Sequence, residues 1–351
     1  MKKILLLLVA LMLSSLAISQ EASTPGKYGR VSIIPRLEVN PWLGNGDGNK
    51  SGSSFGNSSL YTLFEGSLSE HFSWTIANHW LRAEDSYLLY KNIGRSDDVN
   101  FLDYFKLDFT FNNWTISVGK DMILTGGFEY DNWDWDIHTA FASELWNSLP
   151  SYQWGGSVGY TNNSENTTLT LQMTTSPFGE KPLKSKLFSY SGQWRGEYGA
   201  FSNIWSVTAM EYTSGKYDWV VSLGQRVSIG DFYVGLDWTN KLAYYDSEVG
   251  FAKGHNFLGT IGYNAPSEKF DVSLMGGLMN PRRCYTEDEC GDECTCTENY
   301  WNGGAIFQYY PLNNRDMMRL HATANYNSLM ERVYFSIGVT FNLQFYLFGN
   351  D

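Results

Sequence analysis

The segment from Val333 to Gly349, VYFSIGVTFNLQFYLFG, alternates between apolar and mostly small or polar residues. Neighbouring side chains of a β-strand point to opposite faces, so this alternation gives one wholly apolar face. A helix is excluded because the repeat is two residues rather than 3.6. The apolar face is long enough for a tilted membrane strand, which needs roughly 9–11 residues. Its members are Val333, Phe335, Ile337, Val339, Phe341, Leu343, Phe345 and Leu347. The pattern therefore predicts a transmembrane β-strand.

The N-terminus has the layout of an export signal. Lys2 and Lys3 provide a charged start, Ile4–Leu13 an apolar stretch, and Ala17–Ser19 the small residues that a signal peptidase reads. We expect residues 1–19 to be a signal peptide and residues 20–351 to form one membrane domain. No later stretch has the 18 or so consecutive apolar residues of a membrane helix. An exported chain with a membrane strand and no membrane helix is expected to be a barrel.

Composition favours the same fold. Aromatic residues make up 16% of the chain, with 23 Tyr, 21 Phe and 13 Trp, and outer-membrane barrels carry aromatic girdles at both interfaces. The formal net charge of −12 argues against nucleic-acid binding.

Period-2 segments recur along the whole chain and predict about sixteen strands. The connections between them alternate between long and short, as in an up-and-down barrel whose turns lie on one rim and whose loops lie on the other. The long connections are 40–59, 82–100, 121–152, 176–187, 244–255 and 279–300. The sequence therefore predicts an all-β, up-and-down antiparallel transmembrane barrel of about sixteen strands. A barrel of that size leaves an aqueous lumen unless a loop fills it.

The third long connection, Asp121–Tyr152, is predicted to fold into that lumen. Gly126-Gly127 allows a sharp bend, and Thr139–Trp146 is long enough for a short helix capped by Thr139. Carboxylates at a constriction set ion selectivity, and this loop supplies Glu129, Asp131, Asp134, Asp136 and Glu144. Two alternatives stay open: a loop packed over the barrel mouth, and a calcium site built from the aspartates.

Alternation also predicts which charged side chains face the lumen, and they are of both signs. They are Lys106, Asp108, Lys120, Arg195, Glu197, Asp218, Arg226, Asp237, Lys241, Asp271, Arg319 and His321. Inward charges are expected in any wide barrel, so each single residue is more simply explained as part of a solvated wall. We expect a pore constriction in which Lys120 and Arg195 face the carboxylates of the third loop.

All four cysteines, Cys284, Cys290, Cys294 and Cys296, lie in the loop RRCYTEDECGDECTCTENYW. An even number of cysteines in an oxidising compartment predicts disulfides, here two bridges that staple an acidic outer loop. A four-thiolate metal site is the alternative. No cofactor is expected. Enzymatic function is not expected either, because none of the five histidines lies in a recognisable serine motif.

A local motif carries a family resemblance. Val118-Gly119-Lys120 ends a predicted strand with a glycine and a basic residue, and Gly127-Phe128-Glu129 follows within ten residues. This segment, with the overall plan of the chain, resembles the phosphate-selective porin O and P family, in the style of Bacteroidetes outer-membrane porins. The resemblance implies a homotrimeric, water-filled channel with inward-folded loops. The dense arginine ladder of the family's anion-binding members is absent, because acids interleave with the candidate cations.

Taken together, these patterns predict an outer-membrane porin of a Gram-negative bacterium, with lipids and small solutes or ions as its partners. Solutes would diffuse passively, filtered by size and by the charge of the third loop and its facing wall. Two other functions stay open. One is a binding or adhesion barrel that uses the acidic, cysteine-rich loop, and the other is a sugar-specific channel with the loop tryptophans as a stacking track.

Overall fold

The computed structural model describes residues 27–44, 51–56, 58–82, 102–143, 145–146, 149–179, 184–241, 255–279 and 299–349. Strands dominate these ranges, and no helix within them is long and apolar enough to cross a membrane. The expected signal peptide and the four cysteines lie outside the described residues. The cleavage site, the disulfides and the thiolate alternative therefore stay predictions.

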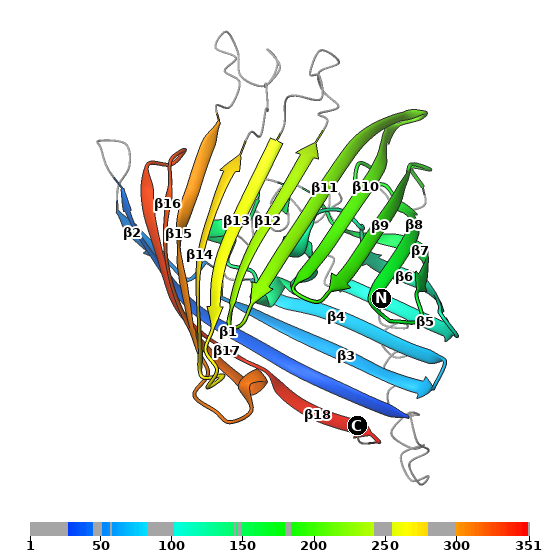
Figure 1. Cartoon of the computed structure of the whole chain (residues 1–351), viewed down its shortest axis with the longest axis horizontal. Helices are drawn as coiled ribbons and strands as arrows, with labels where there is room; N and C mark the ends of the chain where they lie inside the picture. The colour runs from blue at the N-terminus through cyan, green and yellow to red at the C-terminus, as the bar shows by residue number, and fades with distance from the viewer. Residues whose placement is uncertain are drawn as a thin grey trace.

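The strands follow one another around a closed antiparallel barrel (Figure 1). They are β1 (Tyr28–Gly44), β2 (Gly52–Ser54), β3 (Ser59–Ser69), β4 (Phe72–Arg82), β5 (Leu102–Phe111), β6 (Trp114–Met122), β7 (Tyr152–Thr161), β8 (Thr167–Thr175), β9 (Phe188–Tyr198), β10 (Phe201–Thr213), β11 (Lys216–Ile229), β12 (Phe232–Lys241), β13 (His255–Asn264), β14 (Phe270–Met279), β15 (Tyr300–Tyr309), β16 (Met318–Asn327), β17 (Arg332–Phe341) and β18 (Leu343–Phe348). Four short 3₁₀ turns complete the elements: η1 (Phe128–Asp131), η2 (Asp134–Asp136), η3 (Thr139–Phe141) and η4 (Arg315–Met317).

The final strand, expected to be continuous, is divided into β17 and β18. Both pair with β1 in one register, from Leu37 opposite Val339 to Ile33 opposite Leu343. The interruption lies beside Pro35, which has no N–H to donate to the ladder. Counted as one strand, β17 and β18 close the barrel against β1. With the three-residue β2 left out, the barrel then has sixteen strands, which confirms the expected fold.

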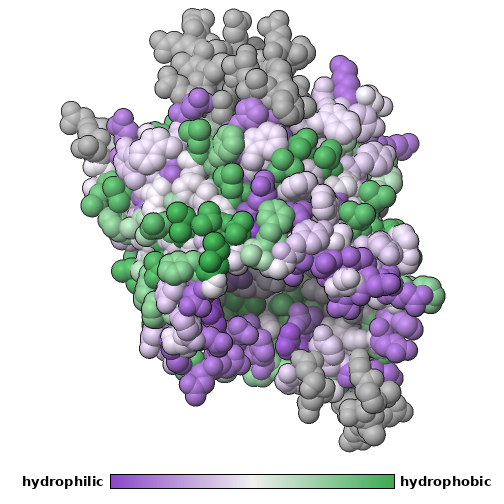
Figure 2. All heavy atoms as spheres, viewed as in Figure 1, coloured by the Kyte–Doolittle hydropathy of each residue, from purple (hydrophilic) through white to green (hydrophobic). Residues whose placement is uncertain are grey.

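The outer wall of the barrel is apolar. Leu171 and Ile337 are 71% and 66% exposed, although both lie in the middle of strands. Exposed apolar side chains of this kind lie on most strands, and Figure 2 shows them gathered across the middle of the face seen there. Aromatic pairs such as Trp114–Tyr160 and Phe232–Tyr263 lie at the rim of the short turns. An apolar band with aromatic residues at its edge is the surface of a membrane-spanning barrel.

The short connections form one rim and are tight turns. Asn112 and Gly230 adopt φ values of 49° and 58° in the turns between β5 and β6 and between β11 and β12. Asparagine and glycine tolerate this left-handed conformation better than other residues, which suits the two-residue turn at Asn112-Asn113. The short β2, which was not expected, lies inside the first long connection and pairs with the outer end of β1.

Candidate pore constriction

The third long loop, residues 123–151, folds into the barrel, as expected (Figure 1). Its entry bends at Gly126, whose φ is +75°. A side chain at Gly126 would collide with the ring of Tyr130, and one at Gly127 would collide with Asp237 of β12. Glycine is therefore required at both positions, because the loop backbone passes directly against the ring of Tyr130 and against Asp237 of the barrel wall. The helix expected at Thr139–Trp146 is not continuous: η3 covers Thr139–Phe141, Ala142 and Ser143 are irregular, and Leu145 and Trp146 are α-helical.

Hydroxyl groups of β10 and β11 hold the first part of the loop. Thr208 Oγ1 donates to the carbonyl of Leu124 at 2.8 Å, and Ser206 Oγ donates to the carbonyl of Gly126 at 3.2 Å. The N–H of Gly126 donates to Ser222 Oγ at 3.0 Å. These bonds satisfy backbone groups that have no secondary structure to pair with, which is the condition for burying a loop.

Asp237 of β12 fixes the next turn. Its two carboxylate oxygens accept from the N–H groups of Phe128 and Glu129 at 3.0 and 2.8 Å, so the side chain caps η1. The guanidinium of Arg226 lies 4.3 Å from the centre of the Phe128 ring, a cation–π contact. Arg226, expected as a lumen cation, therefore packs against the loop itself.

Glu129 is turned into the loop rather than toward the lumen water. Its carboxylate accepts from the N–H and the hydroxyl of Ser143, both at 2.5 Å. Burial raises the pKa of Glu129 to about 7, and the Asp237 carboxylate adds to the rise while the two bonds from Ser143 oppose it.

We predict that Glu129→Gln removes a pH dependence of stability. Because the pKa of the folded Glu129 lies near 7 rather than at its usual 4.5, the folded protein binds this proton more tightly than the unfolded chain does. The stability contribution is complete below about pH 4.5 and is lost as the pH rises toward 7, by about 3 kcal/mol. Thermal unfolding in detergent at pH 5.5 and pH 8.5 measures it. An unchanged pH dependence in the glutamine variant would contradict the assignment to Glu129.

Beyond η1 the loop carries an ion pair and an aromatic stack. Asp131 pairs with Arg195 of β9, and both side chains are about 40% exposed. Trp133 and Trp135 stack with ring centres 4.8 Å apart. Between them, Asp134 accepts from the hydroxyl of Tyr152 at 2.8 Å and from that of Tyr61 at 3.4 Å.

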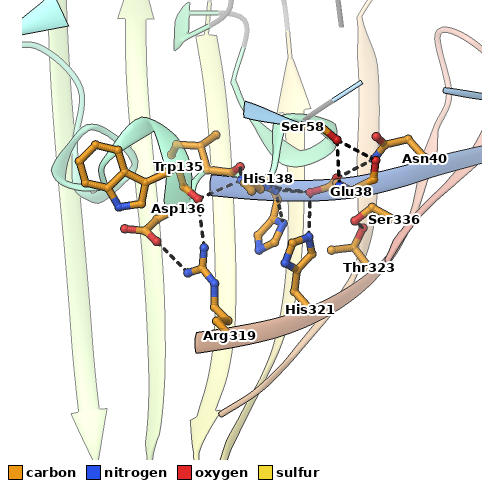
Figure 3. A network of polar contacts seen from close by, with 12 residues as sticks. Glu38, Asn40, Ser58, Trp135, Asp136, His138, Arg319, His321, Thr323 and Ser336 are labelled. Carbon is orange, nitrogen blue, oxygen red and sulfur yellow. Dashed lines mark hydrogen bonds and ion pairs between the residues drawn. The ribbon is translucent and has the colours of Figure 1, made fainter. Parts of the chain in front are cut away.

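The far end of the loop is held by two arginines from β1 and β16. Arg36 donates to the carbonyls of Trp135 and Ile137 at 3.0 and 2.8 Å. Arg319 donates to the carbonyl of Trp135 at 3.0 Å and to the carboxylate of Asp136 at 2.8 Å, as Figure 3 shows. Charge-assisted hydrogen bonds of this kind are about twice as strong as neutral ones. We call these two side chains the arginine latch.

A buried polar network lies behind the latch. The Glu38 carboxylate is fully buried and pairs with Arg36 at 2.5 Å. It also contacts His321 Nε2 at 2.7 Å and accepts from the amide of Asn40 at 2.6 Å (Figure 3). His138 of the loop reaches Arg36 at 3.5 Å and Gln308 at 3.3 Å. The buried charge of Glu38 is thus compensated on several sides, as a buried carboxylate requires.

The loop crosses the lumen from wall to wall. Following the pairing order from β1, strand β10 is the ninth of sixteen, so the two strands are diametrically opposite. Residues before Tyr130 bind β10, β11 and β12, whereas Trp135 to His138 bind β1, β15 and β16. One cavity, of about 220 Å³, lies between residues 138–142 of the loop and strands β1 and β15–β17, and another, of about 180 Å³, lies between residues 123–133 of the loop and strands β5, β6, β9 and β10.

Each end of the crossing has its own apolar support. At one wall Tyr130, Ile123 and Leu145 pack on Met210 and Val220. At the other, Trp135 is 8% exposed and packs on a cluster of wall residues, namely Ile34, Tyr61, Leu63 and Ala77. Burying such side chains is the main favourable term that holds the loop in place.

Two of the remaining expected site residues have other partners. Lys106 lies 3.5 Å from Asp108 and over the ring of Tyr104. Lys120 is 4% exposed and donates to the carbonyl of Leu102 at 2.5 Å, so it is a buried wall residue. The side chain of Lys241 lies outside the described part of the molecule.

No family model matches the sequence of this protein, and no curated protein matches it either. Among solved structures, an anion-selective porin from Comamonas acidovorans aligns with a TM-score of 0.58 at 11% identity, over 90% of this chain and 100% of that chain. A variant of the porin of Rh. blastica aligns with a TM-score of 0.58 at 14% identity, with the same coverage of both chains. The outer membrane channel DcaP of Acinetobacter baumannii gives 0.56 at 13% identity, over 92% and 99%.

The chain has the fold of a bacterial outer-membrane porin. At these identities the likeness establishes the porin architecture alone. It supports the porin-type barrel implied by the resemblance stated above, whereas the narrower phosphate-selective family stays a prediction.

Sequence reasoning missed part of the arginine latch. Arg36 and Glu38 were not among the expected site residues, yet they are 2% exposed and hold the far end of the loop. A signal was present: Ile34, Arg36 and Glu38 share one face of β1, and opposite charges two residues apart on a strand can pair. Pro35, of a residue type that is rare inside strands, obscured that alternation.

Proposed function

We propose that this protein is an outer-membrane channel of a Gram-negative bacterium through which small polar solutes diffuse passively. The observation that carries the proposal is the third loop, which crosses a wide barrel and leaves cavities between itself and the wall in two places. The porin-like architecture and the apolar outer wall support the same function.

The charges at the crossing favour weak ion selectivity. Asp131 is paired with Arg195, Asp136 with Arg319, and Glu38 with Arg36. Opposite charges in direct contact cancel at distances beyond their separation, so they produce little field across the lumen. A phosphate-selective pore, by contrast, would need cations that are available to the solute. The family's phosphate selectivity is therefore not part of this proposal.

The test is ion conductance of the purified protein in a planar bilayer, with the reversal potential measured under a salt gradient. Stepwise openings with a reversal potential near zero are the expected result. A strongly anion-selective potential would restore the phosphate-type channel. Absence of any conductance would overturn the channel function and favour the binding or adhesion barrel.

The exposed ion pair of the loop gives a matched pair of variants. We predict that Arg195→Gln shifts the reversal potential toward cation selectivity, because Asp131 then carries an uncompensated charge at the crossing. Asp131→Asn is predicted to shift it in the opposite direction, because Arg195 is left. Both side chains are partly exposed, so neither change should affect assembly. Shifts of the same sign in the two variants would contradict the assignment.

The oligomeric state is also part of the proposal. A homotrimer, implied by the family resemblance, would place part of the apolar wall against neighbouring subunits. Chemical cross-linking in native membranes tests it.

A further inference from the structure

The cavity against β1, β15, β16 and β17 has the features of a binding site. It measures about 220 Å³ and lies at the outer ends of these strands, between them and the third loop. Drug-sized ligands occupy roughly 300–1,000 Å³, so this space suits a smaller molecule. Thr323 and Ser336 lie on its wall, beside the buried network (Figure 3).

The cavity has both polar and apolar walls, and its described charges are compensated. Glu38 is the carboxylate among its lining residues, and it is neutralised by Arg36 at 2.5 Å. The pKa of His138 lies well below its ordinary value because the imidazole is buried and Arg36, His321 and Arg319 add positive charge around it. His138 is therefore neutral near pH 7. A charged solute would give up its hydration in this cavity without gaining a counter-ion, whereas a neutral polar solute needs no counter-ion.

One lining side chain has an unmet acceptor. Asn302 of β15 is 4% exposed, and its Oδ1 atom has no hydrogen-bond partner. An unsatisfied buried carbonyl costs about 1–3 kcal/mol, and a native protein rarely carries that cost without a reason. A solute that donates an O–H to this oxygen would remove the cost.

The other walls supply the remaining contacts for such a solute. The hydroxyls of Thr323 and Ser336 face each other at 2.9 Å, and Tyr300 and Tyr334 add phenolic rings. An amide, several hydroxyls and aromatic rings together provide both hydrogen bonds and apolar faces. This is the combination that a ring carrying hydroxyls on its edge and C–H groups on its faces requires.

We propose that this cavity is a binding subsite for a neutral, hydroxyl-rich solute of about the size of one sugar ring. The inference rests on the proposed channel function and makes the channel partly selective for such solutes. It differs from a stacking track on the loop tryptophans, because Trp133 lines the other cavity.

The test uses the full chain in planar bilayers with glucose on both sides. Glucose is expected to interrupt the ion current with a saturable dependence on concentration. The control solute is tetraethylene glycol dimethyl ether, which is neutral and of similar size but has no O–H to donate. It is expected to lower the current only as far as it lowers the conductivity of the bulk solution. Inorganic phosphate and glycine, added separately, are expected to show no saturable block.

Asn302→Leu removes the acceptor at similar volume and is expected to raise the half-blocking glucose concentration by up to about tenfold, the effect of one hydrogen bond. Gln193→Leu is the matched control, because this amide lines the other cavity, and it should leave the block unchanged. If Asn302→Leu does not assemble, Tyr334→Leu replaces it and is expected to weaken the block as well.

The subsite would be overturned by equal block by the ether, by block that only Gln193→Leu weakens, or by saturable block by phosphate or glycine instead of glucose. Conducting channels that glucose does not block would remove the subsite and leave the channel function standing. A protein that does not conduct at all would instead overturn the channel function on which the subsite depends.

Discussion

Releasing the arginine latch is expected to raise the single-channel conductance by at least about twofold, because the constriction controls conduction. The variant combines Arg36→Met and Arg319→Met with Glu38→Gln, so that no buried carboxylate is left without its partner. It removes the four hydrogen bonds that bind the loop backbone and Asp136 to the far wall. Planar-bilayer recordings measure the conductance and its open-channel noise, which should rise as the loop end moves.

The control for the latch is Arg315→Met with Asp271→Asn. This pair is also an arginine–carboxylate contact, but it lies at the rim of the short turns and not at the loop. It should leave the conductance unchanged. A latch variant that assembles and conducts like the native protein would show that the apolar cluster around Trp135 alone holds the loop.

Acidification is expected to weaken the same end of the loop through His138. Burial lowers the pKa of His138 well below its ordinary value, and the positive charges of Arg36, His321 and Arg319 lower it further, against the opposing effect of Glu38. A proton on His138 would add one more cation to this cluster. Because the pKa of the folded imidazole is lowered, its stabilising contribution is complete above about pH 6.5 and is lost as the pH falls toward the folded pKa.

Conductance recorded from pH 7.5 down to pH 4.5 checks this expectation. It should rise toward acidic pH in the native protein and stay nearly flat in His138→Gln, whose amide can still reach Gln308. Other groups face His138 from the wall, namely Arg36, Arg319, Glu38, His321 and Gln308. Protonation of Glu129 has the opposite effect on stability, because it favours the folded loop at the other wall of the barrel. A pH response that persists in His138→Gln would assign the effect to one of these groups.

Most of the barrel could be predicted from the sequence, because the residue pattern of each strand depends on the local surroundings of its own side chains. Alternation in the sequence predicts strands at Thr167–Thr175 and Phe188–Tyr198, and β8 and β9 have these bounds. Each side chain of a membrane strand faces either lipid or the lumen, so lipid-facing and lumen-facing residues alternate along every strand. The divided last strand was not foreseen, because its break is caused by Pro35 on a strand more than 300 positions earlier in the chain.

The site was predictable only in part. Gly126, Gly127 and the carboxylates marked the third loop as the segment that enters the lumen, and the structure places it there. The partners of those carboxylates could not be read from the chain. Asp136 meets Arg319 across 183 positions, and Arg36 meets the carbonyl of Ile137 across 101. Nothing in the local pattern distinguishes these arginines from cations on a solvated wall.

The sequence by itself determined the strands, their alternation of faces, the order of long and short connections, and the loop that turns inward. All of these follow from backbone geometry and from the environment of single residues. Only the tertiary structure decided that the loop spans the lumen, that the arginines bind the loop instead of lining the pore, and that the Oδ1 atom of Asn302 lacks a hydrogen-bond partner. Closing the barrel brings β1 and β10 to opposite walls, and the contacts across that distance depend on the closed shape of the whole chain.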